Sequence, residues 1–335
     1  MGRQVEEQAI PGFLGPPPSA PILLVERPDV LSGMVRVVRD RGQRIAITGP
    51  GGAGKSTLAA QVCADRRVRR AFRDGIVWLD AGPGRDPLSL LATLAHRIGL
   101  SKVAAGFAAV EQARDQVSAA LRDRRLLIAL DNVHEQATID AFTGLSATST
   151  VLFTTRFAEL AAAAKATEVR VGPLTAGQSL ELLHRSAGFA AAPALAGARA
   201  LCASTGQLPL GVALAAGMAA GGRTFASVLT AIERARAATE AGPAATEAGQ
   251  AATGGLAEEP HDVAGDDELD LEPDDTLTPE YLTLFRVVLA AVSDLPEPDQ
   301  HRYTELAVFA GHGPFPAAAV RALSPVIIST SIPIA

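Results

Sequence analysis

The feature that most constrains the fold is a glycine-rich stretch between a strand pattern and a helix pattern. Residues 44–48 (RIAIT) are an apolar run, residues 49–56 (GPGGAGKS) fit G-x-x-x-x-G-K-[ST], and an alanine-rich helical pattern follows. This order defines a phosphate-binding loop, or P-loop, because its backbone N–H groups and the helix N-terminus point at one anion. The stretch predicts a nucleotide phosphate site in an α/β domain.

Each residue type in the loop has a mechanical reason. Glycines at 49, 52 and 54 allow the backbone to turn tightly enough for successive N–H groups to face a phosphate. Only three of the 30 Lys and Arg residues are lysines, and Lys55 is one of them. Its flexible ammonium suits the enclosed β- and γ-phosphate site, which the broad fork of arginine does not fit. The predicted nucleotide-binding residues of the loop are Gly49, Gly51, Gly52, Ala53, Gly54, Lys55, Ser56 and Thr57.

A P-loop also needs groups that hold the metal of a nucleotide. Ser56 is placed to bind Mg²⁺, and Thr57 to donate to an inner phosphate. Asp131 ends the apolar run RLLIAL, and it would hold the Mg²⁺ through its water shell at the edge where open α/β sheets bind ligands. The predicted metal site is therefore Ser56 and Asp131.

Apolar runs that alternate with helical patterns indicate the architecture. The strand candidates are residues 44–48, 75–80, 125–130, 150–155 and 168–171. Continuous apolar runs of this length are typical of parallel strands covered on both faces. We therefore predict a doubly wound nucleotide-binding α/β domain over residues 25–172, after a Pro/Gly-rich leader at 1–24.

The pattern changes after residue 172. Residues 173–238 show only helical patterns and predict a small helical bundle, residues 239–279 predict an acidic disordered linker, and helical patterns resume in 280–335. Within the linker, residues 258–275 hold ten acidic residues and no Lys or Arg, so the net charge of −6 would be +4 without them.

Composition narrows the function classes. Apolar residues make up 48% of the chain without an uninterrupted run of about 18, so a membrane span is not predicted. No basic block with interleaved aromatic residues points to nucleic acid. The two cysteines, Cys63 and Cys202, predict buried small side chains rather than a metal site or a disulfide. The expected location is the cytoplasm.

Several stretches, in order, resemble the NB-ARC module of the STAND class of P-loop ATPases, in the apoptotic-ATPase and plant resistance-protein group and in its bacterial form. GPGGAGKST and LLIALDNV resemble the Walker A loop and the Walker B strand. STVLFTTR resembles the sensor strand, which implies that Arg156 touches the γ-phosphate. ERPDVLSGMVRVV implies that Arg27 lies near the base or ribose, and GQLPLGVALAAG implies that Pro209 packs near the adenine. The resemblance also implies ATP or ADP as the nucleotide and the strand order 2-3-4-1-5 for a five-stranded parallel sheet.

Three departures from the family pattern affect the expected activity. Many members have a second acid after the Walker B aspartate, where this chain has Asn132, whose amide cannot act as a base. The Met-His-Asp triplet of the family's winged-helix domain is absent, and His312 does not fit it. Residues 280–335 resemble only the start of a winged helix followed by an atypical tail, which predicts a C-terminally truncated, partial domain.

The leading hypothesis is an ATP/ADP-dependent signalling switch in which nucleotide exchange controls domain opening and self-association, with an unknown effector protein and slow hydrolysis at most. The residues expected to act on the phosphates are Lys55, Asp131, Asn132 and Arg156. The alternatives are an active NTPase or kinase that uses the same loop, or a nucleotide-binding remnant without an output.

Overall fold

The computed structural model describes residues 12–18, 24–40, 42–188, 195–220 and 222–241, and the five residues 283, 286, 287, 290 and 291. These residues divide into two compact units, the first ending at Pro173 and the second beginning at Leu174. The predicted linker and C-terminal domain lie outside the described residues, apart from the end of the last helix and those five positions.

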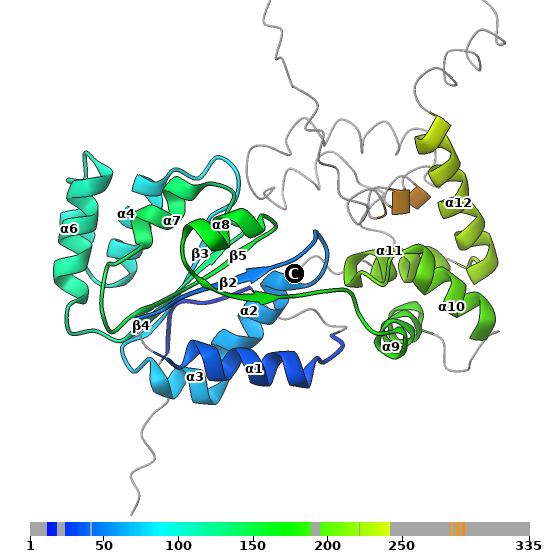
Figure 1. The fold of residues 1–335 in the computed structure, drawn as a ribbon, viewed down its shortest axis with the longest axis horizontal. Helices are drawn as coiled ribbons and strands as arrows, with labels where there is room; N and C mark the ends of the chain where they lie inside the picture. Colours follow the sequence, from blue (N-terminus) through cyan, green and yellow to red (C-terminus); the bar gives the residue numbers. More distant parts are fainter. Residues whose placement is uncertain are drawn as a thin grey trace, which may run out of the picture. The chain divides into compact units, whose positions relative to one another are not determined.

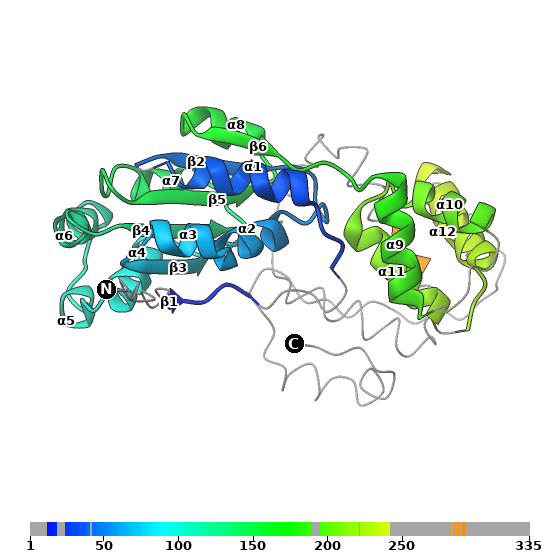
Figure 2. The ribbon, with the colours of Figure 1, turned by 90° about the horizontal axis from the view of Figure 1, so that it is seen from below.

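The first unit contains a six-stranded parallel sheet in the order β1-β3-β4-β5-β2-β6, with β1 and β6 at its edges (Figure 2). The strands are β1 (Phe13–Gly15), β2 (Arg44–Thr48), β3 (Gly75–Asp80), β4 (Leu126–Asp131), β5 (Thr150–Thr155) and β6 (Thr167–Arg170). The order β3-β4-β5-β2-β6 is the predicted order 2-3-4-1-5, which confirms the α/β fold class.

The predicted number of strands was wrong, because a sixth strand pairs with the edge of the sheet. β1 has three residues and lies in the segment assigned to a leader. Phe13 lies opposite Ile76 of β3. A three-residue strand shows no alternation of its own, so only its long-range pairing with β3 identifies it.

Helices cover both faces of the sheet (Figure 1). α4, α6, α7 and α8 lie on one face, and α1, α2 and α3 lie on the other. The helices of this unit are α1 (Pro28–Val38), α2 (Lys55–Ala64), α3 (Arg66–Ala71), α4 (Pro87–Arg97), α5 (Ser101–Ala104), α6 (Val110–Leu121), α7 (Gln136–Phe142) and α8 (Ala158–Ala163).

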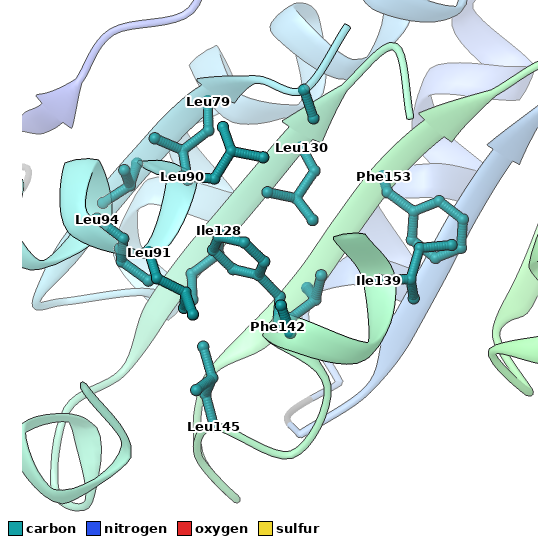
Figure 3. Close-up of a cluster of buried hydrophobic side chains, with 14 of the residues drawn as sticks. Leu79, Leu90, Leu91, Leu94, Ile128, Leu130, Ile139, Phe142, Leu145 and Phe153 are labelled. Atoms are coloured by element: carbon teal, nitrogen blue, oxygen red, sulfur yellow. The ribbon is translucent and has the colours of Figure 1, made fainter. Parts of the chain in front are cut away.

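The central strand β4 shows why the strand patterns are continuously apolar. Leu126, Ile128 and Leu130 point into a cluster with side chains of α4 and α7, including Leu91 and Phe142 (Figure 3). Leu127 and Ala129, the alternate apolar residues of the same strand, face the other layer of helices and are also buried. Because both faces are covered, each position of the strand gains from an apolar side chain.

The second unit is helical, with α9 (Ala176–Ala187), α10 (Leu195–Ser204), α11 (Pro209–Ala220) and α12 (Phe225–Ala241). α9 begins with a capping box in which Thr175 accepts from the backbone of Gln178 and the Gln178 side chain accepts from the backbone of Thr175. Pro209 occupies the first position of α11, where a missing N–H costs nothing.

Two expectations drawn from composition concern the described residues. Cys63 and Cys202 are both buried and unpaired, as predicted. None of the described helices combines the length and the apolar character that a bilayer crossing requires.

Candidate nucleotide-binding site

The P-loop joins β2 to α2 with three glycines in positive-φ conformations. φ is 145° at Gly49, 73° at Gly52 and 91° at Gly54, the residue that precedes the first turn of α2. Side chains other than glycine adopt such angles at a cost of about 1–3 kcal/mol. The three glycines are those predicted to shape the loop, and their conformations confirm that role.

The loop is packed against the end of the edge strand β6. The Val171 N–H donates to the Thr48 carbonyl at 2.7 Å. A Cβ atom on Gly49 would lie 2.2 Å from the Val171 carbonyl oxygen. The first residue of the P-loop is therefore fixed by its close approach to the chain that leads toward the second unit.

Lys55 is the first residue of α2, and its ammonium is turned back into the loop. Nζ donates to the carbonyls of Gly49 at 2.8 Å and Pro50 at 2.9 Å. Burial lowers the pKa of Lys55, Asp131 opposes that shift, and Arg156 adds to it. The lysine thus lies within electrostatic reach of the two charged residues predicted for the same site.

Asp131 is the last residue of β4, Asn132 follows it, and both are hydrogen-bonded to Thr154 of β5. The Thr154 hydroxyl donates to Asp131 Oδ1 and accepts from the Asn132 backbone N–H at 2.9 Å. Asn132 has a φ of 63°, a left-handed conformation that Asn tolerates better than most residues. Since Oδ1 is held by Thr154, the second carboxylate oxygen of Asp131 is the one available for a hydrated metal.

Arg156 is exposed and follows β5. Its guanidinium carbon lies 4.7 Å from the centre of the Phe157 ring. The ring of His134 meets the same aromatic side chain edge-on, with 5.7 Å between the ring centres. The sensor arginine predicted from the sequence is therefore supported by an aromatic residue beside it.

Arg27 lies just before α1 and bonds to the P-loop and to the end of the first unit. Its guanidinium donates to the Gly172 carbonyl at 2.8 Å and to the Ala53 carbonyl at 3.2 Å. Burial lowers its pKa. The structure thus gives Arg27 a role in joining the P-loop to the end of the first unit, and its expected place near the base or ribose stays a prediction.

Ser56 and Thr57 occupy the first turn of α2 after Lys55, and both are partly exposed. Within the part of the chain that the structure describes, neither hydroxyl has a hydrogen-bond partner. A hydroxyl of Ser56 and a carboxylate of Asp131 fit the hard-oxygen donor set of Mg²⁺, which keeps several waters and takes one or two protein ligands. These residues therefore fit a hydrated Mg²⁺ that arrives with a nucleotide.

The first unit brings together the predicted P-loop residues with Asp131, Asn132 and Arg156. Pro209 begins α11 in the second unit and is described apart from them. Thr154, His134 and Phe157 were not predicted as site residues from the sequence. Their places in or directly after β4 and β5, at the carboxyl edge of the sheet, were the signal that could have identified them.

The geometry is that of a P-loop, and comparisons with known proteins find a family model that matches this part of the chain. Residues 31–192 match the NB-ARC domain. The apoptotic protease-activating factor 1 of Danio rerio is 28% identical over 141 residues, which cover 38% of this chain and 11% of that protein. The chain thus spans about a tenth of the length of this curated relative.

Two solved structures are also similar in part. A Signal Transduction ATPase with Numerous Domains (STAND) protein with a tetratricopeptide repeat sensor, from Pyrococcus horikoshii, has a TM-score of 0.41 at 16% identity, over 60% of this chain and 31% of that chain. A Walker-type ATPase of Pyrococcus abyssi has a TM-score of 0.45 at 13% identity, over 65% of this chain and 75% of that chain.

The class is therefore that of the P-loop ATPases, with the parallel sheet, the glycine-rich loop and the Walker B aspartate in their expected order. Within that class, residues 31–192 are similar in sequence to the NB-ARC domain. An NB-ARC domain is a nucleotide-binding signalling module, and this is the coarse function of residues 31–192.

Proposed function

We propose that this chain is a nucleotide-dependent switch that binds ADP in one state and ATP with Mg²⁺ in the other. The observation that supports it is that Lys55 of the P-loop lies within electrostatic reach of Asp131, the last residue of β4, and of Arg156, directly after β5. A γ-phosphate adds contacts that ADP cannot make, and such differential contacts are what a ligand needs to shift an equilibrium.

The roles within the site follow from the side chains. Lys55 exchanges its two carbonyl partners, Gly49 and Pro50, for phosphate oxygens. The N–H groups of the loop and the N-terminus of α2 hold the inner phosphates. Ser56 and the water shell around Asp131 would hold Mg²⁺, which would neutralise charge on the phosphates, while Thr57 would donate to an inner phosphate.

Hydrolysis in this proposal is slow. Asn132 stands where a general base would take a proton from the attacking water, and an amide has no proton-accepting group of suitable basicity. The neighbouring Arg156 stabilises charge on the γ-phosphate and therefore favours binding and recognition of ATP more than its turnover. Nucleotide exchange then controls domain opening and self-association, and an effector protein acts on the result.

The nucleotide carried by the purified protein tests this proposal. We expect acid extraction and chromatography to release ADP from the full chain and from Lys102→Ala, an exposed-lysine control, but not from Lys55→Ala. ATP turnover should stay below about 1 s⁻¹, the low end of usual enzyme rates. A wild-type protein that neither retains nor binds ADP or ATP would exclude the switch, and faster turnover would favour an active NTPase.

A further inference from the structure

Phe157 supports two functional side chains that follow different strands. Arg156 lies over its ring at 4.7 Å, and His134 meets it with an angle of 70° between the ring planes. Arg156 follows β5, and His134 lies between β4 and α7. One aromatic ring therefore connects the segment after the Walker B strand to the sensor arginine.

His134 also holds the side chain of Asn132. His134 Nε2 lies 3.0 Å from Asn132 Oδ1. A carbonyl oxygen only accepts, so the proton of this bond must be on Nε2. The Asn132 amide nitrogen faces the end of β3, where a Cβ on Gly82 would be 3.0 Å from it and 3.2 Å from Asp80 Oδ1. The Asp80 carboxylate only accepts hydrogen bonds, so it favours the amide nitrogen of Asn132 on this side. The amide oxygen of Asn132 then faces His134.

The backbone fixes the two segments that carry these side chains. Besides the bond from the Asn132 N–H to the Thr154 hydroxyl, the Val133 N–H donates to the Thr154 carbonyl at 2.9 Å. The Phe157 N–H donates to the Thr155 hydroxyl at 3.1 Å. Because both segments are anchored to β5, the Phe157 ring and the His134 ring have fixed starting points from which to orient their neighbours.

We propose that Phe157 and His134 are positioning residues that together orient Arg156 and Asn132 toward a γ-phosphate, and thereby set the preference of the site for ATP over ADP. This inference rests on the nucleotide switch proposed above. Without the ring, the guanidinium of an exposed arginine samples many rotamers, and the entropy of ordering it counts against each phosphate contact. His134 has a second effect, because it removes the free rotation of the Asn132 amide that faces the attacking water.

The proposal predicts a loss confined to the γ-phosphate. Affinities of the full chain with Mg²⁺ are measured by titration calorimetry for ADP and for the non-hydrolysable ATP analogue AMP-PNP. We expect Phe157→Leu to weaken AMP-PNP binding by about two- to five-fold relative to ADP binding, the size of one cation–π contact at an exposed site. His134→Ala should act in the same direction.

Conservative variants separate positioning from a merely structural role. Phe157→Tyr keeps the aromatic face, and His134→Gln keeps an N–H donor for Asn132 Oδ1. Each variant should therefore keep the wild-type preference for AMP-PNP over ADP. In an Arg156→Ala background, Phe157→Leu should have a smaller effect than in the wild-type protein, because both substitutions remove the contact between the ring and the guanidinium.

The outcomes distinguish this inference from the function on which it rests. If Arg156→Ala lowers the AMP-PNP preference while Phe157→Leu and His134→Ala retain it, the positioning role is overturned and the switch stands. If the wild-type protein binds neither nucleotide, the proposed function itself fails and the inference fails with it. Additive effects of Phe157→Leu and Arg156→Ala would also overturn the positioning role.

Discussion

His134 lies among charged side chains from three parts of the first unit. Burial is the main cause that lowers the pKa of its imidazole, Arg156 after β5 adds to the lowering, Glu135 opposes it, and Lys55 of α2 adds to it. Every one of these residues belongs to the nucleotide edge of the sheet or to the loop beside it. The charge of a single histidine is therefore coupled to the residues that are proposed to bind phosphate.

This coupling predicts how stability changes with pH. The unfolded chain takes up a proton at His134 near pH 6.5, its usual pKa, whereas the folded protein takes it up only at lower pH. The contribution of neutral His134 is complete above that value and is lost as the pH falls toward the folded pKa. When the pH falls from about 7.5 to about 5.5, the free energy of unfolding should decrease less in His134→Gln than in the wild-type protein, as measured by urea unfolding. His96→Gln, on the exposed surface of α4, is the control. Equal losses would contradict the coupling.

The P-loop, which joins β2 to α2, is held in place by residues 171–172, which follow β6. Gly49 approaches the Val171 carbonyl so closely that no Cβ fits, and Arg27 donates to carbonyls on both sides of this contact, at Ala53 and Gly172. We therefore expect a displacement of the P-loop to displace residues 171–172 as well. Since Gly172 is adjacent to Pro173, where the first unit ends, a change in the P-loop has a short covalent path toward the second unit.

Gly49→Ala should destabilise this junction. The added Cβ meets the Val171 oxygen in a conformation reserved for glycine, so the free energy of unfolding should fall by about 1–3 kcal/mol. Gly33→Ala is the matched control, because Gly33 lies inside α1 with open space around its Cα, and the same change there should stabilise by about 0.5–1 kcal/mol. Denaturant unfolding compares the two. Equal effects of both variants would mean that the close approach of Gly49 carries no strain.

The elements differ in how far the sequence could predict them. β2 to β6 were predicted in the right order, because each is a continuous apolar run and the family resemblance supplied the arrangement. β1 was missed because three residues carry no period, and α3 because RRVRRA offers only one buried residue, Val68. The P-loop glycines were predictable from their spacing. The bond from Arg27 to Gly172 and the bonds of Thr154 to Asp131 and Asn132 were not, because each joins segments that are far apart in the sequence.

The described residues form two units, and the proposed switch needs a nucleotide to change the balance between states of the molecule. Moving a two-state equilibrium from 1:99 to 99:1 takes about 5.5 kcal/mol of differential binding. One charge-assisted hydrogen bond from Arg156 to a γ-phosphate supplies about 1.5–3 kcal/mol. The sensor arginine alone therefore shifts the balance only in part, and a second favourable term is required.

Self-association is the term that we expect to complete the shift, because its contribution grows with protein concentration. Light scattering after size-exclusion chromatography should show one mass with ADP at every protein concentration, and a mass that rises with concentration when AMP-PNP and Mg²⁺ are present. Arg156→Ala should keep the ADP-like mass with AMP-PNP, since it removes the contact that distinguishes the two nucleotides, while Lys102→Ala should behave as wild type. A mass with AMP-PNP that stays independent of concentration would mean that the γ-phosphate acts without assembly, and the differential binding would then have to come from more contacts than Arg156 provides.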